Sequence, residues 1–88
     1  MYAYLAEFLS TLFFAYIVLS TGNPLAMGAA LTFVTLLSYR FSPVTVNPAI
    51  TIVLATAGQI APSEIIPLCV MQVLGALVAL EIYKRYNL

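Results

Sequence analysis

The sequence has 88 residues, 64% of them hydrophobic, with three basic and three acidic side chains and no net charge. This small number of polar residues cannot cover the exterior of a soluble domain of this size. The composition therefore predicts an integral, multi-pass membrane protein. Because the basic residues form no cluster larger than Lys84-Arg85, nucleic acid is excluded as a partner. The absence of His and the single cysteine, Cys69, exclude an ordinary zinc site and an internal disulfide.

The first predicted element is an apolar helix over residues 2–21, in which Glu7 is the only charged residue. At about 1.5 Å per residue this length matches a hydrocarbon thickness of about 30 Å. The N-terminal residues include no Lys or Arg and no evident small-residue cleavage site. We therefore expect a retained membrane span rather than a removable signal peptide.

A second span is predicted over residues 24–39. Its start is marked by Gly22-Asn23-Pro24, which supplies a loop glycine, a capping Asn and a Pro at the first helical position. The segment is somewhat short for a crossing. It ends before Arg40 and Pro43, in a polar and helix-breaking group that marks emergence near a membrane interface.

The third predicted element is a short helix over residues 48–57, which opens with a second Asn-Pro pair at Asn47 and covers only half a crossing. Two interpretations fit its length, a re-entrant half-helix and a helix that lies flat in the membrane interface. An interfacial helix needs a polar face, whereas this segment has only Thr51 and Thr56. This composition favours the re-entrant interpretation.

A re-entrant helix end has consequences for transport. Unpaired backbone at membrane depth is tolerated only where protein or a water-filled cavity satisfies it, so a half-helix predicts a cavity. The helix N-terminus presents N–H groups and about half a positive charge, which attracts lone pairs and repels cations. The amide of Asn47 can offer a further donor to neutral solutes that carry oxygen.

The last predicted span covers residues 63–84, begins at Pro62-Ser63-Glu64, and is interrupted by Gln72 and Glu81. The whole chain is therefore predicted to be one all-α membrane unit of three transmembrane helices plus one re-entrant half-helix. The three carboxylates fall near different segment ends and there is no His, so we predict neither an enzyme nor a cofactor or metal site. Aromatic residues fall near the expected span ends, at the headgroup level: Tyr2, Tyr4, Tyr39, Phe41, Tyr83 and Tyr86.

Three motifs follow one another along the chain. Glu7 is followed by Thr11 and Phe14, a loop segment runs over residues 42–51, and a Gln-x-x-Gly-Ala sequence begins at Gln72, 25 residues after Asn47. These segments resemble the first-span motif, the Asn-Pro-Ala loop and the third-span motif of the aquaporin and glycerol-facilitator family. The resemblance covers nearly the whole chain and corresponds to the first half of a family member.

The resemblance implies a channel. In the family, two inverted three-span repeats each contribute a half-helix, and the two Asn-Pro-Ala ends meet in the pore. Residues 1–88 hold one repeat, so the resemblance implies a subunit that passes water or small neutral solutes such as glycerol. An inverted copy of itself or a second half-channel would complete the pore, within a larger oligomer in the lipid bilayer. The alternative is a non-conducting truncated fragment or an assembly subunit of a larger channel.

The resemblance also assigns roles to single residues. Asn47, Pro48 and Ala49 would form the central constriction. Glu7 would accept hydrogen bonds from the re-entrant loop, and Gln72 would support the same loop. The filter would be largely apolar and without a fixed cation, so glycerol-like solutes remain candidate substrates for transport. The positions that line it by analogy are Met27, Thr35, Val44 and Ile50.

The charges at the two ends bear on orientation. With the N-terminus inside, the α-amino group and Arg40 lie on one side of the membrane, and Lys84 and Arg85 lie on the other. This balance of positive charge favours neither orientation under the positive-inside rule. We therefore expect insertion in both orientations, which would supply the antiparallel dimer.

Overall fold

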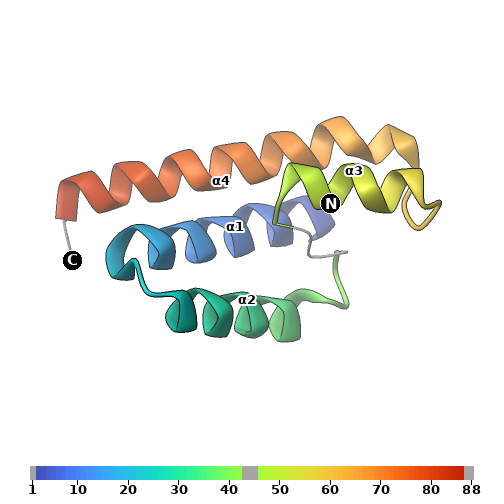
Figure 1. Ribbon diagram of the computed structural model, residues 1–88. Coiled ribbons are helices and arrows are strands. Elements are labelled where there is room, and N and C mark those ends of the chain that lie inside the picture. The colour runs from blue at the N-terminus through green and yellow to red at the C-terminus, as the bar shows by residue number, and fades with distance from the viewer. Residues whose placement is uncertain (1, 43–45, 87–88) are drawn as a thin grey trace.

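The computed structural model describes residues 2–42 and 46–86, which form four α-helices and one 3₁₀ turn (Figure 1). No strand occurs in these two ranges, so the all-helical part of the predicted fold is confirmed. The elements in chain order are α1 (Tyr2–Thr21), α2 (Pro24–Ser38), α3 (Pro48–Thr56), η1 (Pro62–Glu64) and α4 (Ile65–Tyr86).

Both Asn-Pro pairs start a helix. The side chain of Asn23 accepts hydrogen bonds from the N–H groups of Leu25 at 2.8 Å and Ala26 at 3.1 Å. The side chain of Asn47 accepts one from Ala49 N–H at 2.8 Å. The proline that follows has no N–H group, so at the first helical position it leaves no backbone donor without a partner. The asparagine and the proline together therefore start a helix within two residues.

The helix ends differ slightly from the predicted ranges. α2 and α3 each end one residue earlier, at Ser38 and Thr56. α3 stops because Gly58 adopts a left-handed φ of 81°, and Gln59 N–H then bonds the carbonyl of Leu54 at 2.9 Å. The predicted span over 63–84 is divided into η1 and α4, and α4 continues to Tyr86 because the basic residues in its last turn favour the carbonyl end of the helix.

α1 lies between α2 and α4. α1 and α4 run in the same direction with the most extensive contact in the molecule, and α2 lies against the other side of α1 (Figure 1). α1 and α4 approach each other closely at Gly75, where an added Cβ would meet the carbonyl oxygen of Phe8 at 2.5 Å. At one end of this pair, the Tyr4 hydroxyl donates to both carboxylate oxygens of Glu64, at 2.9 and 3.0 Å.

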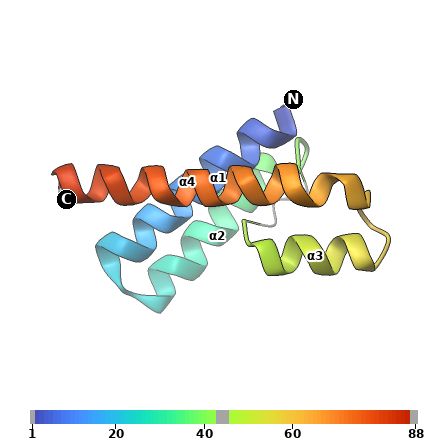
Figure 2. The same cartoon turned by 90° about the horizontal axis from the view of Figure 1, so that it is seen from above.

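α3 lies against the first half of α4 and runs antiparallel to it. Two perpendicular views show that α3 begins beside the middle of α4 and ends beside the start of α4 (Figures 1 and 2). Within the described residues α3 packs on α4 and η1, but not on α1 or α2. The N-terminus of α3 therefore lies near the middle of the 39 Å long axis of the molecule.

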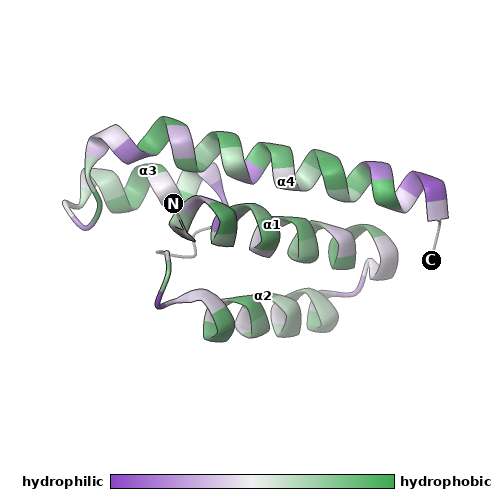
Figure 3. Ribbon diagram, turned by 180° about the vertical axis from the view of Figure 1, so that it is seen from behind, coloured by the Kyte–Doolittle hydropathy of each residue, from purple (hydrophilic) through white to green (hydrophobic). Residues whose placement is uncertain are grey.

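The polar and apolar residues are distributed in the reverse of the pattern of a water-soluble protein. Hydrophobic residues predominate along the helices (Figure 3), and many large apolar side chains are exposed, with exposed fractions of 82% at Leu25, 74% at Ile66 and 67% at Leu36. Such a surface is unfavourable in water and favourable in lipid. The buried residues, in contrast, include a set of polar ones: Glu7, Ser10, Thr11, Ser42, Thr51 and Gln72.

Two segments are long and apolar enough to cross a membrane, Ala3–Thr21 and Pro62–Tyr86. α2 is also apolar but has 15 residues, a length of about 22 Å. The structure is therefore that of a helical protein with two candidate membrane spans and two shorter apolar helices, α2 and α3.

Candidate functional site

A buried carboxylate lies at the centre of the candidate site. Glu7, in α1, has an exposed fraction of 0%. Its Oε2 accepts a hydrogen bond from the Ser42 hydroxyl at 3.0 Å, and its Oε1 accepts from Val46 N–H and Gln72 Nε2, both at 3.2 Å. A carboxylate is tolerated in such a place only when donors satisfy it. Glu7 thus joins α1 to α4 and to the segment before α3.

Gln72 extends these connections to α3. Its Nε2 donates to Thr51 Oγ1 at 2.9 Å as well as to Glu7, and both Gln72 and Thr51 are almost fully buried. The Thr51 hydroxyl in turn donates to the carbonyl oxygen of Asn47 at 3.1 Å. A chain of hydrogen bonds therefore runs from α1 through α4 to the first turn of α3.

The role of Thr51 is a feature that the sequence analysis did not identify. In the sequence, Thr51 is one of two polar residues in the half-helix and belongs to the loop motif. Its position four residues after Asn47 was an available signal, because a helical threonine can bond the carbonyl four residues earlier. The contact with Gln72, 21 residues later, has no local signature.

The first turn of α3 is exposed at Asn47, Pro48 and Ala49, the three residues predicted to form a constriction. Asn47 Oδ1 is engaged in capping Ala49 N–H, which fixes the orientation of the side-chain amide. The same amide has N–H donors on its other atom, and the helix dipole adds positive potential at this end. This helix end can therefore attract an electron-rich oxygen atom and repel a cation.

The residue before this turn has an unusual backbone conformation. Val46 adopts φ of 41°, in the left-handed region that a β-branched residue rarely occupies. Holding a residue there costs on the order of 1–3 kcal/mol. The hydrogen bond from Val46 N–H to Glu7 helps to hold this conformation. The position of the α3 start therefore depends on the buried carboxylate.

Of the residues predicted to line a filter, two lie on α2. These two, Met27 and Thr35, are eight positions and thus about 12 Å apart along the helix. A narrow filter at one depth of the pore can therefore include at most one of these two residues. The Thr35 hydroxyl donates to the carbonyl of Leu31 at 2.8 Å. Ile50 is exposed on α3, and Val44 lies outside the described residues. Their role as a filter stays a prediction.

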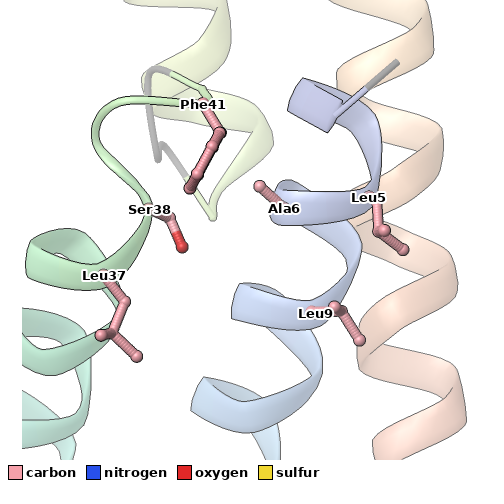
Figure 4. A pocket seen from close by; sticks show the side chains of 6 residues that line it. All are labelled: Leu5, Ala6, Leu9, Leu37, Ser38 and Phe41. Atoms are coloured by element: carbon pink, nitrogen blue, oxygen red, sulfur yellow. The ribbon is translucent and has the colours of Figure 1, made fainter.

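A surface groove follows the seam between α1 and α2, with a volume of about 260 Å³ (Figure 4). Its lining includes no carboxylate, amine or thiol, so it lacks the groups for acid–base or metal chemistry. Among the described residues as a whole, no cluster of three potential metal ligands occurs. The groove is lined by Leu5, Ala6, Leu9, Leu37, Ser38 and Phe41.

Comparison with known protein families, with curated proteins and with solved structures found no match for this chain. The family resemblance therefore rests on the three sequence motifs.

Proposed function

We propose that this chain is one half of an aquaporin-type channel, with three spans and one re-entrant half-helix. In this proposal it passes water or small neutral solutes such as glycerol, and an inverted second copy completes the pore. The observation that carries the proposal is the position of the α3 N-terminus. It begins beside the middle of α4, is exposed, and is anchored to the buried residues Glu7, Gln72 and Thr51.

The depth of the α3 N-terminus in the membrane supports this function. The molecule extends 39 Å along its long axis, against about 30 Å for the hydrocarbon core of a bilayer. If that axis lies along the membrane normal, the start of α3 is near the bilayer centre, where an exposed helix end needs water or protein to satisfy it. A water-filled lumen at Asn47 meets this need, and the positive helix end opposes cations there.

The surface suits lipid rather than water. Exposed apolar side chains suit a lipid environment, whereas the buried polar residues suit a protein interior that faces no lipid. α2 is short for a crossing, but the exposed aromatic residues Tyr39 and Phe41 follow its last turn and can extend the element to the headgroup level. α1, α2 and α4 then form the three spans.

One copy does not enclose a lumen. α3 is covered on one side by α4, while Ile50, Ile52 and Val53 are about half exposed. An inverted copy, related by a two-fold axis in the membrane plane, supplies the missing wall with the same residues. Basic side chains are few at both ends, Arg40 at one and Lys84 and Arg85 at the other, so the charge bias toward a single orientation is small.

The test is stopped-flow light scattering on proteoliposomes that contain only this chain, with water and glycerol gradients. We expect shrinkage faster than that of empty liposomes, and loss of the excess rate in Asn47→Asp. Aspartate caps a helix as well as asparagine, so α3 should remain folded while the amide donors are lost and a negative charge is added.

Asn23→Asp is the matched control, because Asn23 caps α2 through the same kind of hydrogen bonds. Its rate should equal that of the unmodified protein. If correctly inserted protein gives no excess rate, a pore built from identical halves is ruled out. If Asn47→Asp conducts as well as Asn23→Asp, the central role of Asn47 is wrong.

A further inference from the structure

A shallow groove of about 340 Å³ follows one face of the second half of α4. All of its lining residues belong to α4 and recur at intervals of three and four positions, so they form one strip along the helix. The strip changes in character toward the C-terminal end of α4. Its apolar residues are Leu74, Leu77, Val78 and Ile82. Its polar and aromatic residues are Glu81, Arg85 and Tyr86.

The strip has about the length of one membrane leaflet. From Leu74 to Arg85 it rises about 16 Å along the helix, against about 15 Å for half of a hydrocarbon core. The candidate membrane span Pro62–Tyr86 has Leu74 at its middle. Its C-terminal end is hydrophilic (Figure 3) and projects beyond the ends of α1 and α2 (Figures 1 and 2). With this span across a bilayer, Arg85 lies at the headgroup level and Leu74 near the membrane centre.

Arg85 supplies a positive charge at the outer end of the strip. The neighbouring Lys84 is paired with Glu81, with Nζ 3.5 Å from Oε2, so these two charges largely cancel. Within residues 2–42 and 46–86 Arg85 forms no salt bridge, and its side chain is exposed. A guanidinium group can bind a phosphate through two parallel N–H groups, which makes arginine well suited to this anion.

We propose that this groove binds one anionic phospholipid of the surrounding bilayer, with the phosphate on Arg85 and one acyl chain along the apolar strip. Charge complementarity selects this occupant. The three charged side chains leave one net positive charge, and a phosphatidylglycerol headgroup carries one negative charge at the same depth. The ammonium group of phosphatidylcholine cancels its phosphate charge, so that lipid should bind less tightly. The inference requires that α4 crosses the membrane, but not that the chain conducts.

The experiment uses the full chain with one introduced tryptophan, because the sequence contains none. Leu74→Trp places this reporter at the apolar end of the strip. The protein is reconstituted into mixtures of phosphatidylglycerol and phosphatidylcholine in which one lipid at a time carries brominated acyl chains, which quench tryptophan fluorescence on contact. We expect phosphatidylglycerol to be preferred about fivefold, the factor that one arginine near an anionic surface supplies.

A matched reporter lies on another helix. Leu31→Trp makes the same substitution at the middle of α2, with an exposed fraction of 38% against 44% at Leu74. This reporter should be quenched by both brominated lipids, with no preference for either one. It shows that the protein is inserted and measures the unspecific contact with lipid.

Three charge variants in the Leu74→Trp background test the phosphate contact. Arg85→Gln should reduce the preference to about one. Arg40→Gln removes the same charge outside the strip, where Arg40 lies over the Tyr39 ring, and should leave the preference unchanged. Glu81→Gln should raise the preference severalfold, because Lys84 loses its partner and a second positive charge faces the headgroup.

Equal affinity of the two lipids for Leu74→Trp overturns the proposal, and so does a preference that Arg85→Gln retains. A preference that Arg85→Gln and Arg40→Gln reduce equally reflects the net charge of the protein, and it refutes a local site. If both lipids quench Leu31→Trp and neither quenches Leu74→Trp, a protein partner covers the strip and the lipid site is wrong. None of these outcomes depends on solute flux.

Discussion

Replacing Gly75 with alanine tests the contact on which the whole helix arrangement depends. A Cβ at this position would lie 2.5 Å from the carbonyl oxygen of Phe8, 3.2 Å from the amide nitrogen of Leu12 and 3.3 Å from Cβ of Thr11. The first two atoms are backbone atoms of α1, so a change of side-chain rotamer cannot relieve the overlap. The two helices must move apart by somewhat less than 1 Å to restore ordinary contact.

The magnitude follows from two opposing effects. Overpacking a close contact costs about 1–3 kcal/mol, and contact with backbone places this site at the upper end of that range. Alanine in place of glycine favours a helix by about 1 kcal/mol. We therefore expect Gly75→Ala to lower the free energy of unfolding by about 2 kcal/mol, a change of roughly 30-fold in the folded-to-unfolded ratio.

The assay is unfolding by titration with sodium dodecyl sulfate in mixed micelles, followed by circular dichroism. Gly28→Ala is the control, because an added Cβ there meets no atom within 4 Å and the site lies in α2. This variant should be unchanged or up to about 1 kcal/mol more stable. If Gly75→Ala is as stable as Gly28→Ala, then α1 and α4 do not approach each other closely at Gly75.

Two further predictions concern the buried network. Glu7→Gln keeps one acceptor oxygen, which can still face Val46 N–H and Gln72 Nε2, but it removes the negative charge that strengthens these bonds and the bond from Ser42. We therefore expect a loss of about 1–3 kcal/mol in the same unfolding assay, and an unchanged stability would contradict the hydrogen bonds assigned to Glu7. Thr51→Val removes the acceptor for Gln72 and should reduce solute flux, whereas Thr56→Val, at an exposed position on the same helix, should leave it unchanged. Equal flux in the two threonine variants would show that the link between Gln72 and α3 has no part in conduction.

The helix starts could be predicted from the sequence because their causes are local. An Asn-Pro pair supplies the cap and the first helical residue within two positions, and both Asn23 and Asn47 act in this way. The 3₁₀ turn at Pro62–Glu64 was not predicted as a separate element. A proline at the start fits both an α-helix and a 3₁₀ turn, so the local signal did not distinguish them.

The contacts within the candidate site were less predictable. The motif resemblance indicated Glu7 and Gln72 as residues that support the loop, but Gln72 contacts Glu7 across 65 positions of the chain. The left-handed conformation of Val46 runs against the preference of a β-branched residue. Both features depend on tertiary hydrogen bonds, and neither the periodicity nor a capping pattern of a single sequence predicts such bonds.

The network around Glu7 has a further consequence for how α3 is held. A helix of nine residues is marginal by itself, because a short helix gains few hydrogen bonds after the unfavourable first turn. Within the described residues α3 packs only on α4 and the short η1 turn, and its first turn follows a strained residue. The bonds from Gln72 to Thr51 and from Val46 to Glu7 therefore fix the end of α3 that carries Asn47, while α4 contacts and the Gly58 turn hold its other end. Weakening the network should displace Asn47 before it reduces the helix content, so in Thr51→Val the solute flux should fall while circular dichroism stays nearly constant.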